Sequence, residues 1–323
     1  MKLPSGVRDW LPRELAAKRA VEATLRAVFE RWGYAEVQTP TFERFDVLES
    51  GLGEALAEQT FRFSDRRGVA LALRPEMTTP IARLVSTRMR NEPLPLRLCY
   101  VAPAYRYEEP QEGRMREFTQ GGTELIGSDG VDADAEALFM ALEAFDAIGL
   151  RDARFDINHA AVVDGILASM DLHASAAAGC KGLIADRNLV GLREMFAAEP
   201  RRLEVLLSLA TLRGGSDVLA FARRACTTEA GAAGIDRLAE ILARAADRGF
   251  AARVSIDLGL LRDLEYYTGF IFEGFVDELG FALCGGGRYD TLLPRFGYDA
   301  GAVGWMVSVE RLLIALERRA ILA

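Results

Sequence analysis

The sequence is poor in the residues that bind metals or form disulfides. Its 323 residues include only two histidines, His159 and His173, which form no HxH or HxxxH motif. We therefore expect no metal site. The four cysteines lie far apart and form no CxxC pair, which is typical of buried free thiols in a reducing compartment: Cys99, Cys180, Cys226 and Cys284.

Long apolar runs and several common enzyme motifs are also missing. No stretch approaches the roughly 18 apolar residues of a membrane-spanning helix, and the N-terminus lacks a signal-peptide core. We therefore expect a cytoplasmic protein with no membrane partner. Neither GxSxG nor a Walker A loop occurs. The triple glycine at 285–287 is not followed by the Lys-Ser/Thr of a phosphate loop, and we expect it to form a tight turn between strands.

The composition indicates a folded, acidic protein. Half of the residues are hydrophobic, which is enough to bury a core in one large or two modest domains. The 39 basic and 47 acidic residues give a net charge of −8. Since affinity for nucleic acid comes largely from neutralised phosphates, this charge argues weakly against such a partner.

Charged, aromatic and amide side chains occur at strand spacing between residues 105 and 127. The segments YRYEE and REFTQ flank a Pro-Gly loop and predict two antiparallel strands. Because side chains two apart share a strand face, Arg116, Phe118 and Gln120 point the same way, and Glu124 joins them if the strand continues. Such a surface suits a small zwitterion and a nucleotide. A solvated hairpin of mixed charge fits this stretch equally well.

The hydrophobic pattern predicts an α+β fold with an antiparallel sheet. An apolar stripe indicates a helix over 14–32, a second stripe covers 138–145, and alternation at 155–157 and 254–258 indicates strands. The segment from about 160 to 249 is rich in Ala, Leu and Arg and nearly without Pro. It predicts a wholly helical insertion within one larger domain.

Six motifs in a fixed order point to a known family. In this order they resemble the catalytic domain of histidyl-tRNA synthetases, a class II aminoacyl-tRNA synthetase family, and the resemblance covers nearly all of residues 1–323. It implies a class II synthetase-like domain, and TPTFE, which is similar to the family's dimer-forming motif, implies a homodimer core. The motifs are PSGVRDWLP at 4–12, TPTFE at 39–43, LRPEMTTPIAR at 73–83, LLRDLEYYTGFIFE at 260–273, GGGRYD at 285–290 and AVGWMVSVERLL at 302–313.

The resemblance implies a histidine-binding site. Charge-assisted hydrogen bonds in a cleft would hold the amino acid. Taken alone, Glu76 would be an ordinary surface carboxylate after a turn. The matched residues are Glu76, Gln120 and Glu124 for the α-ammonium and imidazole, Tyr267 for the aromatic side with Tyr266 and Tyr289 close to it, and Arg262 for the arginine characteristic of histidine activation.

The resemblance also implies a nucleotide side, where planar guanidinium groups would bind phosphates. The alternative is that these arginines persist as structural ion pairs with Glu108, Glu124 and Glu310. The matched residues are Arg106 for the α-phosphate, Arg311 for the arginine of the third motif, Phe118 for the ring under the adenine, and Arg114, grouped with them as vestigial.

Three departures weaken a catalytic interpretation. Met77 stands where the synthetases have glycine after RPE, Ser308 replaces a glycine of the third motif, and Asp263 replaces the glycine after Arg262. Glycine lets a backbone approach a ligand closely, so these side chains should narrow the ATP cleft and oppose its charge. The sequence also stops soon after Arg311, where the synthetases continue into an anticodon-binding domain. We therefore expect no such domain and no tRNA partner.

These departures resemble a non-catalytic branch of the family, the regulatory subunits of ATP phosphoribosyltransferase. The resemblance implies a hetero-oligomer with the short catalytic subunit, which joins ATP to phosphoribosyl pyrophosphate in the first step of histidine biosynthesis. Histidine would be the feedback effector, and no cofactor is implied. The alternative is a truncated enzyme that makes histidyl-adenylate, favoured by the survival of Arg106, Arg262 and Arg311. A structural paralogue with an empty pocket is the third possibility.

Overall fold

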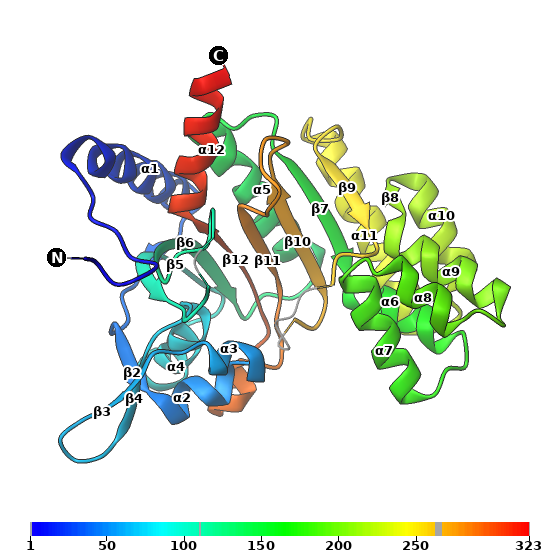
Figure 1. Cartoon of the computed structure of the whole chain (residues 1–323), viewed down its shortest axis with the longest axis horizontal. Coiled ribbons are helices and arrows are strands. Elements are labelled where there is room, and N and C mark those ends of the chain that lie inside the picture. Colours follow the sequence, from blue (N-terminus) through cyan, green and yellow to red (C-terminus); the bar gives the residue numbers. More distant parts are fainter. Residues whose placement is uncertain (1, 110, 262–266, 323) are drawn as a thin grey trace. The chain divides into compact units, whose positions relative to one another are not determined.

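The computed structural model describes residues 2–109, 111–261 and 267–322. They form two compact units (Figure 1). Unit 1 contains the described residues up to Ala153 and from Gly274 onward, and unit 2 contains those between Arg154 and Glu273. Within the described ranges, no helix is both long and apolar enough to cross a membrane.

Unit 1 is built on a sheet whose strands follow the order β1-β5-β6-β12-β11, and it also contains a small sheet in the order β2-β4-β3. Most neighbouring strands are antiparallel, as the sequence predicts, but the short β1 runs parallel to β5. The elements are α1 (Pro12–Arg31), β1 (Ala35–Glu36), β2 (Phe42–Arg44), α2 (Phe45–Gly51), α3 (Glu54–Glu58), β3 (Arg62–Ser64), β4 (Ala70–Leu73), α4 (Thr78–Arg88), β5 (Leu96–Tyr105), β6 (Glu117–Ile126), α5 (Val131–Ile148), β11 (Cys284–Arg288), the 3-10 helix η1 (Leu293–Phe296), β12 (Ala302–Ser308) and α12 (Val309–Leu322).

The strands β5 and β6 form the hairpin that carries the candidate site. They pair from Leu96 opposite Ile126 to Tyr105 opposite Glu117. The prediction of a strand at YRYEE is therefore wrong, because β5 ends at Tyr105 and the pairing partner of β6 is the apolar segment before it. Pro103 lies inside this strand, although proline is unusual within one.

The helix α1 covers one face of this hairpin. Pro12 occupies the first helical turn, where its missing N–H costs nothing, and the buried stripe includes Leu25 and Phe29. Gly121 of β6 leaves room for Leu25, since a Cβ there would lie 2.8 Å from the Leu25 Cδ1 atom. The Phe29 ring packs edge-on against Trp305 with 5.8 Å between centroids. The opposite face of β6 is therefore the one on which Gln120 and Glu124 lie.

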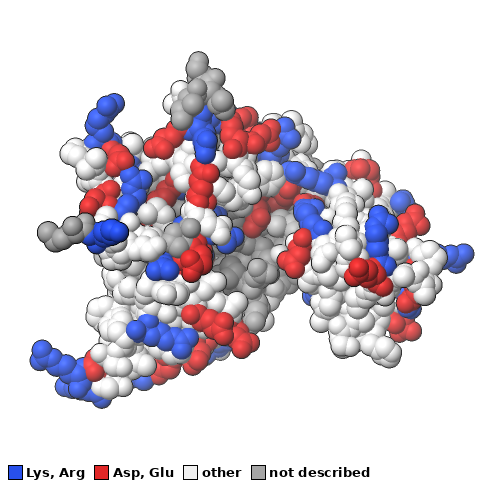
Figure 2. Space-filling model, in the orientation of Figure 1, with Lys and Arg blue, Asp and Glu red and all other residues white. Residues whose placement is uncertain are grey.

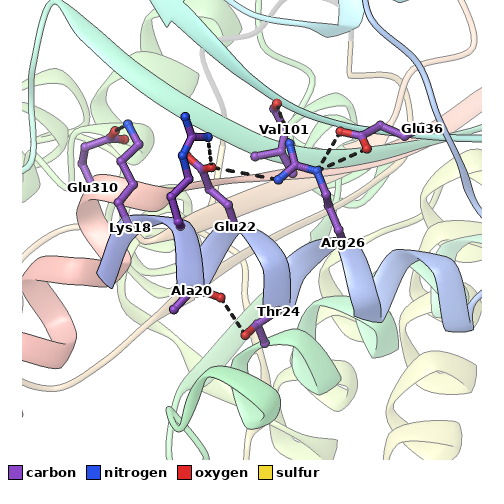
Figure 3. A network of polar contacts seen from close by, with 9 residues as sticks. Lys18, Ala20, Glu22, Thr24, Arg26, Glu36, Val101 and Glu310 are labelled. Atoms are coloured by element: carbon purple, nitrogen blue, oxygen red, sulfur yellow. Dashed lines mark hydrogen bonds and ion pairs between the residues drawn. The ribbon is translucent and has the colours of Figure 1, made fainter. Parts of the chain in front are cut away.

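A polar network joins α1 to the strands beneath it (Figure 3). Lys18, Glu22 and Arg26 are four residues apart and point from one helix face toward the sheet. Lys18 donates to Glu310 at the start of α12 over 2.8 Å, and the Thr119 backbone N–H donates to the same carboxylate over 2.8 Å. Glu310 is only 6% exposed. It therefore connects α1, β6 and α12 through two charge-assisted hydrogen bonds.

Unit 2 combines strands with a group of helices. Its strands follow the order β10-β7-β9-β8, and β7 and β9 are parallel because helices connect them. The segment at about 160–249 is not wholly helical as predicted, because the short strand β8 interrupts it. Unit 2 also extends beyond this segment on both sides. That residues 160–249 form an insertion subdomain remains a proposal. The elements are β7 (Arg154–His159), α6 (Ala160–Ala168), α7 (Ala174–Ala185), α8 (Leu189–Met195), α9 (Pro200–Thr211), β8 (Arg213–Gly214), α10 (Ser216–Ala225), α11 (Glu229–Asp247), β9 (Val254–Asp257) and β10 (Phe270–Phe275).

The triple glycine does not form a turn. Gly285, Gly286 and Gly287 lie inside β11, where they are buried and pair with Met306, Trp305 and Gly304 of β12. The expectation of a tight turn between strands is therefore wrong. Glycine at these positions removes side chains from a buried sheet and allows close approach from neighbouring elements.

Removing the Glu310 carboxylate should destabilise unit 1. The change Glu310→Ala leaves the Lys18 ammonium group, in a side chain only 12% exposed, without its partner. Loss of one partner of a buried pair costs about 3–5 kcal/mol, and we expect the lower end of this range in the free energy of unfolding measured with urea. Glu317→Ala, an exposed position on the same helix, is the control and should change it by less than about 0.5 kcal/mol. Equal effects of the two variants would contradict a structural role for Glu310.

Candidate ligand-binding site

Glu76 lies between β4 and α4, where the chain turns into the helix. Its two carboxylate oxygens accept the backbone N–H groups of Thr78, over 2.6 Å, and Thr79, over 2.9 Å. These donors belong to the first turn of α4 and have no partner within the helix. Glu76 is 4% exposed, so it is not the surface carboxylate that its local sequence alone would suggest. Burial raises its pKa, and the two N–H groups oppose that rise.

The turn that carries Glu76 is held by Arg74. The Arg74 guanidinium is buried and donates to backbone carbonyls of Thr39, over 2.6 Å, and Pro103, over 2.8 Å. Its own backbone N–H donates to the Thr41 carbonyl. Arg74 therefore ties the TPTFE segment and β5 to the residues that precede α4.

Glu124 lies on β6, and neutral donors bind it. The Thr78 hydroxyl donates to one oxygen over 2.9 Å, and the Tyr289 hydroxyl donates to the other in a short hydrogen bond. Glu124 is 1% exposed. Burial raises the pKa of its carboxyl group to about 8, the charge of Glu76 adds to the rise, and the two hydroxyl groups oppose it.

The two carboxylates meet at Thr78. This residue donates its backbone N–H to Glu76 and its hydroxyl to Glu124. Within the described parts of the chain, no lysine, arginine or histidine side chain is hydrogen-bonded or ion-paired to either carboxylate. Buried carboxylates are normally paired with cations or bound to metals. The arrangement therefore favours a cationic ligand.

Gln120 adds an unused amide to the same face of β6. It is 1% exposed, and among the described residues neither its side-chain nitrogen nor its side-chain oxygen has a hydrogen-bond partner. An unsatisfied buried amide costs free energy, and such groups are rare in folded proteins. Gln120 lies opposite Ala102 of β5 and Ser308 of β12, both of which have small side chains. It can offer a donor and an acceptor to one ligand.

The arginines expected to bind phosphate are held by backbone carbonyls. Arg106 donates to the Pro75 carbonyl over 2.9 Å, and its guanidinium lies 5.2 Å from the centroid of the Phe118 ring. Arg311 donates to the carbonyls of Gly113, over 2.8 Å, and Ala282, over 2.6 Å. Arg114 is exposed in the loop between β5 and β6.

Among the described residues, one of the expected structural ion pairs is present, since Arg106 lies 3.9 Å from a Glu108 oxygen. Glu124 accepts hydrogen bonds from Thr78 and Tyr289, and Glu310 accepts them from Lys18 and Thr119. Arg262, the third arginine of that alternative, lies outside the described residues, so its pairing stays a prediction.

The remaining expected residues are not part of this cluster as described. Arg262, Asp263 and Tyr266 fall outside the described residues. Tyr267 belongs to unit 2 and is half-buried. On unit 1, hydrogen bonds through Thr78 link Glu76, Glu124 and Tyr289, and Gln120 lies on the same face of β6 as Glu124.

Two of the departures from the synthetase motifs have a local explanation. Met77 has no exposed surface and occupies the residue just before α4, so it contributes to the core. Ser308 immediately precedes α12, and its hydroxyl oxygen accepts the Arg311 backbone N–H over 3.4 Å. This is the position at which serine commonly caps a helix.

Sequence reasoning did not assign a role to three further residues. Thr78 and Thr79 follow Glu76, and the side chain of Thr79 is completely buried. Gly304 lies opposite Glu124 on β12, and a Cβ there would lie 2.0 Å from a Glu124 oxygen. The sequence does show two hydroxyl-bearing residues, Thr78 and Thr79, close after Glu76, and this pattern could have indicated their role. The need for glycine at 304 becomes visible only with the strand register.

Known proteins match this chain over nearly all of its length. The family model described as histidyl-tRNA synthetase matches residues 6–312. The chain is 45% identical to the ATP phosphoribosyltransferase regulatory subunit of Moorella thermoacetica over 98% of this chain and 82% of that protein. It is 40% identical to the protein of the same name from Geobacter metallireducens over 98% of this chain and 74% of that protein.

Solved structures of related proteins have the same fold as this chain. A crystal structure from Bacillus halodurans, described as an ATP phosphoribosyltransferase regulatory subunit/histidyl-tRNA synthetase, has a TM-score of 0.89 and 33% identity over 98% of this chain and 83% of that one. Histidyl-tRNA synthetase from Nostoc sp. has a TM-score of 0.85 over 100% of this chain and 76% of that one, and its 23% identity supports the fold alone. The expected class II synthetase-like α+β fold is confirmed.

Adding one methyl group at position 304 should disturb the Glu124 environment. In Gly304→Ala the new Cβ would lie within 2.6 Å of the Thr123 backbone oxygen and even closer to the Glu124 carboxylate, so the sheet must shift. We expect a loss of about 1–3 kcal/mol in the free energy of unfolding, measured by urea denaturation. Gly280→Ala is the control, because a Cβ at this exposed position meets nothing within 4 Å. Identical midpoints for the two variants would contradict the close approach.

Proposed function

The chain belongs to the histidyl-tRNA synthetase-like family of ATP phosphoribosyltransferase regulatory subunits, and from this membership we propose that its Gln120 pocket senses histidine. It serves as a regulatory subunit and works with an ATP phosphoribosyltransferase catalytic subunit, in histidine biosynthesis, rather than catalysing a reaction of its own. Feedback requires histidine to bind one state of the complex better than another.

The unused amide of Gln120 carries this proposal. It offers a donor and an acceptor on the face of β6 that also carries the Glu124 carboxylate, which has no cationic partner among the described residues. An amino acid with a cationic ammonium group and a side chain that both donates and accepts hydrogen bonds satisfies these groups together. Histidine has both features. The resemblance also assigns Arg262, Tyr266 and Tyr267 to histidine binding, and this assignment stays a prediction.

We extend the proposal to the assembly. The catalytic partner is the short form of the enzyme, and the regulatory chains form a homodimer core through the TPTFE segment. Within the chain, Arg74 connects this segment to the turn that carries Glu76 through the carbonyls of Thr39 and Pro40. The complex is proposed to be cytoplasmic.

A tRNA partner is not part of the proposal. The net charge is −8, and on the face shown in Figure 2 the basic and acidic side chains of the described residues are interspersed rather than gathered in one basic surface. Binding to nucleic acid depends on neutralising many phosphates with basic residues. These observations support a protein partner and a small-molecule effector.

Replacing Gln120 with methionine should separate binding from stability. Gln120→Met keeps the length of the side chain and removes the unsatisfied amide, so the ligand-free protein should be as stable as the parent or slightly more stable. Histidine binding, measured by isothermal titration calorimetry, should weaken at least about tenfold, because the ligand loses about 1.5 kcal/mol of hydrogen bonding or more. Histidine inhibition of the complex with the catalytic subunit should weaken in parallel.

The control for this variant is Gln38→Met, an exposed position that should leave binding unchanged. A Gln120→Met protein that is clearly less stable but binds histidine normally would show that Gln120 is structural. The histidine site would then lie elsewhere.

The nucleotide side should be inactive. Because Arg106 and Arg311 donate to backbone carbonyls, their guanidinium groups are less available to phosphate than in a working adenylation site. We expect no histidine-dependent ATP–pyrophosphate exchange by the isolated chain, with an intact histidyl-tRNA synthetase as the positive control. Exchange at the rate of that enzyme would support the alternative of a truncated, adenylate-forming enzyme.

A further inference from the structure

The ligand-free site contains two buried carboxylates, and no cationic side chain of the described residues is bound to either of them. Glu76 is 4% exposed and Glu124 is 1% exposed. The groups that bind them are two backbone N–H groups and the hydroxyl groups of Thr78 and Tyr289, all of which are neutral. Two ionised carboxylates in such a place repel each other, and each loses the hydration that stabilises its charge.

The elements packed around Glu124 bring no positive charge to it within the described part of the chain. Glu76 is the neighbouring acidic group, and its charge opposes ionisation of Glu124. The negative charge of Glu124 also contributes to the raised pKa of Tyr34, whose hydroxyl donates a hydrogen bond to Glu136. The groups that face Glu124 directly are Thr78 from α4, Gly304 from β12, Leu98 from β5 and Tyr289 after β11.

We propose that the free pocket holds one proton on the Glu76–Glu124 pair and that the effector enters as a cation in exchange for this proton. The inference rests on the proposed histidine site and adds its charge chemistry. Carboxylates that share a site commonly retain a proton, which then belongs to the pair rather than to one residue. Thr78, which binds both groups, holds them in this arrangement.

The exchange is balanced in charge and in protons. Before binding, the pair carries one negative charge and one proton, and the α-ammonium group of the effector lies in water. After binding, the ammonium group faces two ionised carboxylates and one proton has passed to the buffer. The ammonium charge favours the ionised form of a nearby carboxylate, in the same way that a lysine or arginine does. Burial raises the pKa of Glu124 to about 8 in the free pocket, which is consistent with a proton retained at neutral pH.

Calorimetry on the full chain measures this exchange directly. Histidine is titrated at pH 7.0 in phosphate and in Tris, which differ in their enthalpy of protonation, and the difference in observed heat gives the number of protons released. We expect more than half a proton and up to about one proton per bound histidine. Between pH 6.5 and 7.5 the dissociation constant should fall by about five- to tenfold, close to the tenfold per pH unit of a single released proton.

Two variants identify the source of the proton. Glu124→Gln should bind histidine more weakly, release almost no proton and lose most of the pH dependence. Tyr289→Phe removes a hydroxyl that lowers the pKa of Glu124, so the pH dependence should extend to higher pH. It also keeps the inference testable if Glu124→Gln does not fold. Glu117→Gln, an exposed position on the same strand, should behave like the parent.

A ligand analogue tests the role of the ammonium group. Imidazolelactate carries a hydroxyl group in its place, so any binding should occur without proton release. Equal proton release by imidazolelactate and histidine would overturn the exchange.

The possible results distinguish this inference from the proposed function. Histidine binding with neither proton release nor pH dependence overturns the exchange and leaves the histidine site intact. Proton release that persists in Glu124→Gln also overturns it, because the proton then comes from another group. If histidine does not bind to the chain or to its complex with the catalytic subunit, both proposals fail.

Discussion

The burial of Glu76 and Glu124, with no cationic partner among the described residues, is the constraint on which the site depends. Burying a charge is costly unless hydrogen bonds or an opposite charge replace the lost water. Here the start of α4 supplies N–H groups to Glu76, and Thr78 and Tyr289 supply hydroxyl groups to Glu124. The helix start fixes the N–H groups, and Tyr289 follows directly after β11. Both carboxylates are therefore held in place by neutral donors from separate segments of unit 1.

The sheet needs space for the side chains of Glu124 and its neighbours, and glycines provide it. Gly304 stands opposite Glu124, where a methyl group would overlap the carboxylate. On the same strand as Glu124, Gly121 admits Leu25 of α1 and Gly122 lies against the Tyr100 ring on the other face. The hairpin is thus packed closely on both faces. Close packing keeps the polar residues of one face in a single arrangement, which a selective binding site requires.

The sequence predicted the fold class better than the boundaries of individual strands. Periodicity located α1 and the strands β7 and β9, and motif order indicated the synthetase-like fold. The strand prediction failed at YRYEE and the turn prediction failed at the triple glycine, because turn-forming residues there suggested boundaries that tertiary packing does not use. The side-chain pattern placed Gln120 and Glu124 on one face. It could not show that, among the described residues, the Gln120 amide has no partner and Glu124 is bound by neutral donors, since both depend on contacts between distant segments.

The charge state of the pocket also connects ligand binding to the stability of the free protein. The folded-state pKa of Glu124 is raised from 4.5 to about 8. The folded chain therefore binds this proton more tightly than the unfolded chain, so the associated stability is complete below pH 4.5 and is lost as the pH rises through about 8. Under the proposed exchange, a cationic effector favours the ionised pair. The stabilisation that it provides should then grow as the pH rises towards about 8.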